Sequence, residues 1–193
     1  MSRKAVVLVI VIVAVLSSGV LAHAASRATV DSLQTDATAH DLFASFVVKG
    51  AFDDHLKEQL SAGLPLEFVH SVEVARRRLL WFDKVLARKT ITTTVTYDTL
   101  TRQYSLSKKV NDEVAETSVA INQAEVERWM THIDRVRLAD PTHLNDGEEG
   151  DLYVRVRSML RKRFVMLFVP WDVQTGWERV MLSLPAEVTR SAR

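Results

Sequence analysis

Short segments in which apolar and polar residues alternate constrain the fold of this chain more than any other feature. Residues 66–74 read LEFVHSVEV, residues 91–97 read ITTTVTY, and residues 152–160 read LYVRVRSML. A period of two places alternate side chains on opposite faces of a β-strand. The β-branched residues of 91–97 favour the same conformation. The sequence therefore predicts a mainly β protein.

Two short helices are expected between the strands. The first begins at a predicted N-cap, Asp53, and ends near Ala62, whereas the second covers about 122–132 and opens with Asn122-x-x-Glu125, a capping-box pattern. Further strands are expected at 42–48, 103–107, 136–138, 164–169 and 177–184. Together these elements predict an antiparallel β-sandwich or a strongly twisted antiparallel sheet with two short helices.

The N-terminal 24 residues have the three-part pattern of a secretory leader. Arg3 and Lys4 precede an apolar run over 5–16, and the segment closes on Ala22-His23-Ala24, a small-x-small cleavage site. About eighteen apolar or small residues also come close to the length of a membrane-spanning helix. A cleaved signal peptide and an uncleaved signal anchor are both consistent with this pattern. In either case we expect export across the cytoplasmic membrane, with the remaining chain in the periplasm.

The rest of the chain is expected to form one domain. The predicted division is a signal peptide or anchor at 1–24, a tether at 25–40, a single β-rich domain at 41–185 and a frayed tail at 186–193. The sequence contains no cysteine, which excludes disulfides, thiolate metal sites and cysteine nucleophiles. The core must therefore be stabilised by packing alone, and a chain of this length can bury a sizeable one. We expect a monomer.

Charge is unevenly distributed along the sequence. Without residues 1–24 the chain carries 23 basic and 24 acidic residues, a balance that argues against a nucleic-acid-binding protein. Residues 73–109 hold nine basic and three acidic side chains, whereas residues 110–151 hold three basic and eleven acidic ones. Two interpretations follow. These segments neutralise each other across the fold, or the arginines form a basic surface that faces an envelope protein or an anionic membrane. The candidate surface residues are Arg76, Arg78, Arg155, Arg157, Arg161 and Arg163.

One block of the sequence resembles a known family. Residues 76–104 read RRRLLWFDKVLARKTITTTVTYDTLTRQY, which is similar to exported bacterial proteins that contain the domain of unknown function 4390. The resemblance extends over about residues 41–184 and implies an exported or membrane-anchored protein with no assigned activity. The residues that carry it, which we interpret as structural, are Trp81, Asp83, Tyr97, Leu100, Thr101 and Tyr104.

The sequence offers no motif for catalysis, cofactor binding or metal binding. It contains no phosphate-binding glycine motif, no HExxH and no GxSxG. His70 lies on the apolar face of its strand and is interpreted as a buried structural histidine. The acidic turn at 146–151 is interpreted as a solvated hairpin tip, although its carboxylates are also of the type that binds calcium. We expect no enzymatic activity and no cofactor.

The function expected from the sequence is that of a non-catalytic envelope domain that binds a protein or a membrane surface. The alternative is a β-sandwich that binds a small molecule or a lipid in an aromatic cleft. Its candidate lining residues are Trp81, Tyr97, Tyr104, Trp171 and Trp177.

Overall fold

A computed structural model describes residues 28–79, 82–144, 148–161 and 173–184. Most of these residues are in antiparallel strands. The elements in chain order are β1 (Thr29–Ala37), β2 (Leu42–Lys49), α2 (Asp54–Ser61), β3 (Leu66–Arg76), β4 (Lys84–Asp98), β5 (Gln103–Val110), β6 (Glu113–Ala120), α3 (Gln123–Thr131), β7 (His132–Ala139), a 3-10 helix (Pro141–Leu144), β8 (Leu152–Arg161), β9 (Val173–Gln174) and β10 (Glu178–Met181).

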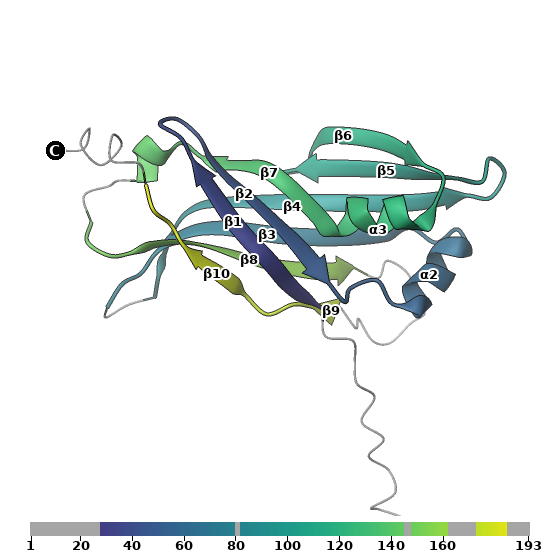
Figure 1. The fold of residues 1–193 in the computed structure, drawn as a ribbon, viewed down its shortest axis with the longest axis horizontal. Helices are drawn as coiled ribbons and strands as arrows, with labels where there is room; N and C mark the ends of the chain where they lie inside the picture. The colour runs from purple at the N-terminus through teal and green to yellow at the C-terminus, as the bar shows by residue number, and fades with distance from the viewer. Residues whose placement is uncertain (1–27, 80–81, 145–147, 162–172, 185–193) are drawn as a thin grey trace, which may run out of the picture.

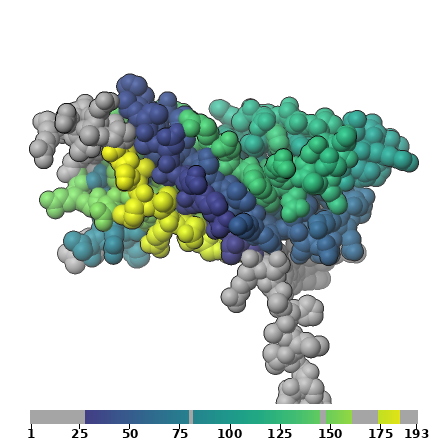
Figure 2. Space-filling view, viewed as in Figure 1, coloured from purple at the N-terminus to yellow at the C-terminus, as the bar shows by residue number. Residues whose placement is uncertain are grey.

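The strands form two antiparallel sheets. The small sheet has the order β1-β2-β7, and the large sheet has the order β10-β8-β3-β4-β5-β6, with β9 paired to β8. Figure 1 shows β1 and β2 crossing in front of the large sheet, whereas α3 and α2 lie towards the right of the view. Along one margin β1 contacts β10, and the residues of these two strands lie side by side in Figure 2. The mainly β prediction is confirmed.

Two buried clusters cover one face of the large sheet. The first lies between the sheets and includes Phe46 from β2, Val72 from β3 and Val156 from β8. The second lies beneath the helices and includes Leu60 from α2 and Met130 from α3. The small sheet and the helices therefore share one face of the large sheet.

Local sequence explains both helices and one hairpin. The carboxylate of Asp53 accepts a hydrogen bond of 2.9 Å from the N–H of Leu56, and the side chain of Asn122 caps α3 in the same way. Asn111 and Asp112 have φ angles of 50° and 68°, which is the backbone conformation of a two-residue hairpin turn. The two predicted helices are confirmed.

Three expectations about strands were wrong or incomplete. The predicted tether at 25–40 is wrong for Thr29–Ala37, which forms β1 and pairs with β2. Strand β6 was not predicted, because seven of its eight residues are exposed and show no alternation. Strand β7 covers His132–Ala139 rather than only 136–138.

Several expectations lie outside the described residues. They concern the leader at 1–24, Trp81, Arg163, the strand at 164–169, Trp171 and the tail at 186–193. Within the part of the chain that is described, no helix combines the length and apolar character needed to cross a membrane.

Candidate functional site

The face of the large sheet that points away from the small sheet carries a group of arginines. On β8, Val154 and Val156 point into the core, and Arg155 and Arg157 therefore point to the opposite face. Both buried clusters lie on the core side, and no described helix or strand packs over this opposite face. We call it the open face. The inward and outward positions on β8 are as predicted from its alternation.

A buried carboxylate organises the centre of the open face. Glu73 on β3 is 3% exposed and lies between its register partners, Arg88 on β4 and Arg155 on β8. Arg88 Nε donates to Glu73 Oε1 at 2.8 Å, and Arg155 Nε donates to Glu73 Oε2 at 2.7 Å. The Nη2 atoms of the two guanidinium groups lie at 2.7 and 2.6 Å from the same oxygens. One carboxylate therefore holds two arginines in fixed positions.

Trp177 places a third arginine beside this pair. The guanidinium carbons of Arg155 and Arg157 lie 4.6 and 4.8 Å from the centre of the Trp177 ring, within the range of a cation–π interaction. Trp177 directly precedes β10, which pairs with β8. The same pairing brings Arg179 over the ring of Tyr153 at 5.8 Å. The open face therefore presents Arg88, Arg155, Arg157 and Arg179.

Tyr153 and Asp83 close one end of the open face. The Tyr153 hydroxyl donates a 2.5 Å hydrogen bond to the Asp83 carboxylate. This bond lowers the pKa of Asp83, whereas burial, followed by the bond to Asp83, raises the pKa of Tyr153. Asp83 is one of the residues that carried the family resemblance, and its contact anchors the β3–β4 connection to β8.

The structure separates the arginines that the sequence grouped together. Arg76 is 4% exposed and lies on the core face, where it donates to the backbone carbonyls of Leu144 and Glu148. Arg78 and Lys84 each lie 2.6 Å from the Glu148 carboxylate, and these two bonds lower its pKa. These basic groups partly neutralise the acidic turn, as one of the two interpretations predicted.

The predicted surface is therefore only partly assembled. Arg155 and Arg157 lie together, but Arg76 does not reach their face. Arg161 belongs to β8 and pairs in register with Glu67, while its side chain and Arg163 lie outside the described residues. Arg88, Arg179 and Trp177 join the group instead. Strand alternation around Glu73 could have indicated a carboxylate on this face, but no local signal identifies its partners.

The remaining residues of the family resemblance have structural surroundings. The rings of Tyr97 and Tyr104 lie 4.7 Å apart, and burial raises the pKa of Tyr104. Leu100 and Thr101 belong to the β4–β5 turn, where their N–H groups donate to the Asp98 carboxylate. These bonds lower the pKa of Asp98. The β4–β5 turn is thus fixed by one aspartate and by a pair of tyrosine rings.

His70 forms a buried pair with Ser158 that the sequence did not predict. His70 Nδ1 lies 2.7 Å from Ser158 Oγ, and His70 is fully buried. Burial lowers the pKa of His70 to about 4, with an opposing contribution from the Met130 backbone. In the described part of the chain no carboxylate bonds to this imidazole, so the pair lacks the third member of a catalytic triad. It is interpreted as a neutral structural contact between β3 and β8.

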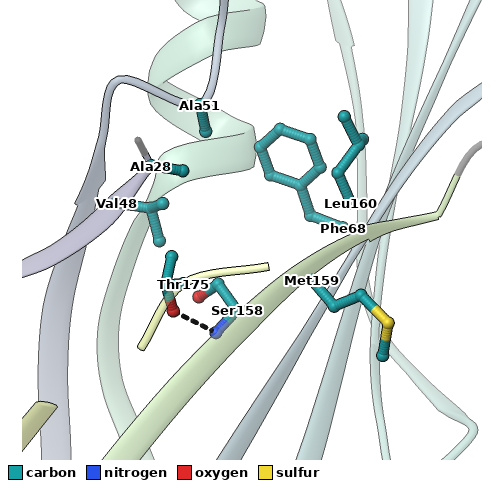
Figure 3. Close-up of a pocket in the computed structure, with 8 residues that line it drawn as sticks. All are labelled: Ala28, Val48, Ala51, Phe68, Ser158, Met159, Leu160 and Thr175. Carbon is teal, nitrogen blue, oxygen red and sulfur yellow. Dashed lines mark hydrogen bonds between the residues drawn. The ribbon is translucent and has the colours of Figure 1, made fainter. Parts of the chain in front are cut away.

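A small apolar cavity lies next to this pair. Figure 3 shows Phe68, Leu160 and Val48 around it, with Thr175 accepting a hydrogen bond from the N–H of Ser158. The cavity measures about 10 Å³ and is partly open to solvent. It is not the predicted aromatic cleft, because Tyr97 packs with the core beneath the helices whereas Trp177 lies on the open face.

The acidic residues do not assemble into an evident metal centre. Among the described residues, no group of three or more histidine, aspartate or glutamate side chains is placed to hold a metal ion. Residues 145–147 of the acidic turn lie outside the described part, and Glu148 is engaged by Arg78 and Lys84.

The fold and the open face define a β-rich domain of two antiparallel sheets with an arginine-bearing surface. Residues 25–181 match the family described as Domain of unknown function (DUF4390). The chain therefore belongs to this family, as the resemblance around residues 76–104 indicated. No curated protein matches this chain. No solved structure matches it either.

Proposed function

We propose that this chain is a non-catalytic interaction domain of the bacterial cell envelope, and that its open face binds an acidic partner protein. The observation that carries the proposal is the group formed by Arg88, Arg155, Arg157 and Arg179 around Glu73 and Trp177. In this proposal the two sheets form a β-sandwich, and its exposed outer face is the working surface.

The choice of an acidic protein follows from the kind of cation on the open face. A guanidinium group binds a carboxylate through two parallel hydrogen bonds, which gives directional recognition. Glu73 and Trp177 fix the positions of Arg155 and Arg157, so less side-chain freedom is lost on binding. Attraction to an anionic membrane requires clustered positive charge but no fixed geometry. A preorganised arginine group therefore favours a protein surface that bears carboxylates.

The proposed location rests on residues 1–24, whose basic, apolar and small-residue segments fit a leader for export. The working domain then lies in the periplasm, either released by cleavage after Ala24 or held by the uncleaved segment. Mass spectrometry of the protein recovered from a bacterial envelope distinguishes the two, since cleavage gives an N-terminus at Ala25. Recovery of the protein only from the cytoplasm contradicts the proposal.

The interaction is tested with the double variant Arg157→Gln/Arg179→Gln. The full chain is titrated with a glutamate-rich peptide, and binding is followed by the fluorescence anisotropy of a label on the peptide. We expect the variant to bind at least about tenfold more weakly, since each charged contact contributes about 1 kcal/mol or more. The control Arg77→Gln/Arg102→Gln removes the same charge from two exposed arginines at opposite ends of the large sheet and should bind like the unchanged chain.

The same variants are tested on vesicles of anionic phosphatidylglycerol. Equal loss of peptide binding in both double variants shows that only net charge matters, and this contradicts the proposed surface. Strong vesicle binding that the open-face variant abolishes, without peptide binding by the unchanged chain, assigns the surface to the membrane instead.

A small-molecule or lipid-binding function has less support. Of the residues expected to line a cleft, those that the structure describes lie on opposite faces of the large sheet, with Tyr97 and Tyr104 on the core face and Trp177 on the open face, and the cavity in Figure 3 is small. We therefore do not propose it as a second function.

A further inference from the structure

The two sheets lie together along one margin and leave two edge strands along the other. β1 contacts β10 at the first margin. At the second margin β6 ends the large sheet and β7 ends the small one, and no described strand pairs with the outer edge of either. An edge strand presents unpaired N–H and C=O groups that accept a further strand.

Strand β6 is the more regular of these two edges. Residues Glu116–Ala120 pair with β5 without interruption, because the register shift lies before them, between Val114 and Glu116. In contrast, β7 has two register shifts against β2, and Arg135 has a φ of 44°. Bulges and irregular backbone are devices that protect an edge from further pairing. Strand β6 contains no proline and no lysine, so it retains an edge that is open to pairing.

A groove runs along the inner side of β6. Its lining includes Glu116 and Ser118 of β6, Trp129 of α3 and Asp134 of β7, and its volume is about 730 Å³. Lys108 lies 4.4 Å above the ring of Trp129 and pairs with Glu116 at 3.0 Å. Alternate side chains of an added strand would enter this groove. The others would lie beside Val119, which is 59% exposed.

The charge around β6 indicates the chemistry of the added strand. Three carboxylates line the groove, those of Glu116, Glu125 and Asp134, and they outnumber its two basic groups, Lys108, which is paired with Glu116, and Arg128. Asp112 and Glu113 add two further negative charges where β6 begins. Val114 and Ile121 add exposed apolar surface, at 62% and 73% exposure. Basic side chains therefore complement this edge, and alternating apolar side chains cover its exposed valines.

From these observations we propose that β6 binds an extended basic segment of a partner polypeptide by adding it as a further strand of the large sheet. Main-chain hydrogen bonds to β6 provide the affinity, while the acidic residues and the groove select a segment in which basic and apolar residues alternate. This site is distinct from the open face, which selects acidic groups. The inference therefore stands or fails independently of the proposed function.

The test uses the full chain and a labelled octapeptide of alternating lysine and valine. Binding is measured by fluorescence anisotropy, and backbone protection is measured by hydrogen exchange. We expect the peptide to bind and to slow exchange at the amides of residues 116–120. A peptide of alternating glutamate and valine should bind at least tenfold more weakly. Equal binding of both peptides, or peptide binding without protection of β6, overturns the proposal.

Three variants separate strand addition from non-specific attraction. Val119→Lys places a charge on the exposed side of β6, which disfavours strand addition, and should weaken binding at least tenfold. Leu79→Lys adds the same charge at a residue that is 100% exposed in the β3–β4 connection and should leave binding unchanged. Asp112→Asn/Glu113→Gln should weaken binding several-fold and reduce its salt dependence. Circular dichroism verifies that each variant is folded.

One competing occupant is a second copy of this chain, paired through β6. Facing copies would bring Glu113 and Glu116 of both edges together, a repulsion that salt relieves. Protection of residues 116–120 that requires no peptide and grows with protein concentration and salt would assign the edge to self-association and would overturn the proposal.

Discussion

Replacing Glu73 with glutamine tests the organisation of the open face most directly. The carboxylate is 4% exposed as a side chain, and each of its oxygens receives one guanidinium group at 2.6–2.8 Å. Hydrogen bonds to charged groups contribute about 1.5–3 kcal/mol each. The side chains of Arg88 and Arg155 are 62% and 26% exposed, and solvent reduces these contributions. We therefore expect Glu73→Gln to lower the free energy of unfolding by about 2–3 kcal/mol.

The assay is urea denaturation of the full chain, followed by circular dichroism, with a thermal melt as a second measure. A loss of this size lowers the melting temperature of a domain of this length by about 4–12 °C. Arg88→Gln is the matched control, since it removes one exposed partner and should cost no more than about 1 kcal/mol. A change below about 0.5 kcal/mol for Glu73→Gln, or an equal loss for Arg88→Gln, would refute the reasoning.

The same variant links stability to the proposed function. Glu73→Gln removes the internal partner of Arg88 and Arg155 without removing either guanidinium group. Because the proposal depends on fixed arginine positions, the affinity for a glutamate-rich peptide should fall together with stability. A rise in affinity would mean that the release of charge from Glu73 outweighs the fixed positions, and it would contradict the preorganised surface.

Three further predictions concern stability. His70→Gln should reduce the dependence of the unfolding free energy on pH. The pKa of His70 is about 4 in the folded protein and 6.5 for the ordinary imidazole, so the unfolded chain binds a proton more readily. The unchanged protein therefore loses stability as the pH falls from about 6.5 towards 4. Urea denaturation at pH 5.0 and 6.5 measures how much the unfolding free energy changes with pH in the unchanged protein and in the variant. An equal change in both proteins contradicts the lowered pKa of His70. Phe46→Ala should cost about 3–5 kcal/mol in the same assay because Phe46 is 2% exposed, whereas Phe82→Ala at 96% exposure should stay within about 0.5 kcal/mol. Asp53→Ala should cost about 1 kcal/mol by removing the N-cap of α2, and Asp53→Asn should restore most of it; equal melting of both variants would exclude the capping role.

Local sequence predicted the elements whose signal lies within a few residues. Alternation on β8 identified which side chains face the core, because neighbouring residues of a strand must point to opposite faces. Asp53 and Asn122 marked the helix starts, since each side chain bonds to a backbone N–H three residues ahead. Asn111-Asp112 was an available signal for the hairpin that leads into β6, although the strand itself carries no alternation.

The same local signals missed strands that are stabilised by pairing. Strand β1 was predicted as part of a tether because residues 25–40 are mostly polar and small, and only one of its nine residues is buried in the structure. Its backbone hydrogen bonds to β2 supply the missing stabilisation. An edge strand needs little apolar surface when its neighbour provides the backbone partners, so composition and periodicity do not reveal it.

The candidate site was decided by tertiary structure. The sequence placed Arg155 and Arg157 on one face of a strand, but it also grouped them with Arg76, which occupies the core face of β3. Register between β3, β4 and β8 set Glu73 between two arginines, and the pairing of β10 with β8 brought Trp177 to them. Alternation follows from the geometry of a single strand and can be read locally. Register joins residues that are far apart in the chain, so only the packed sheet determines which charges meet.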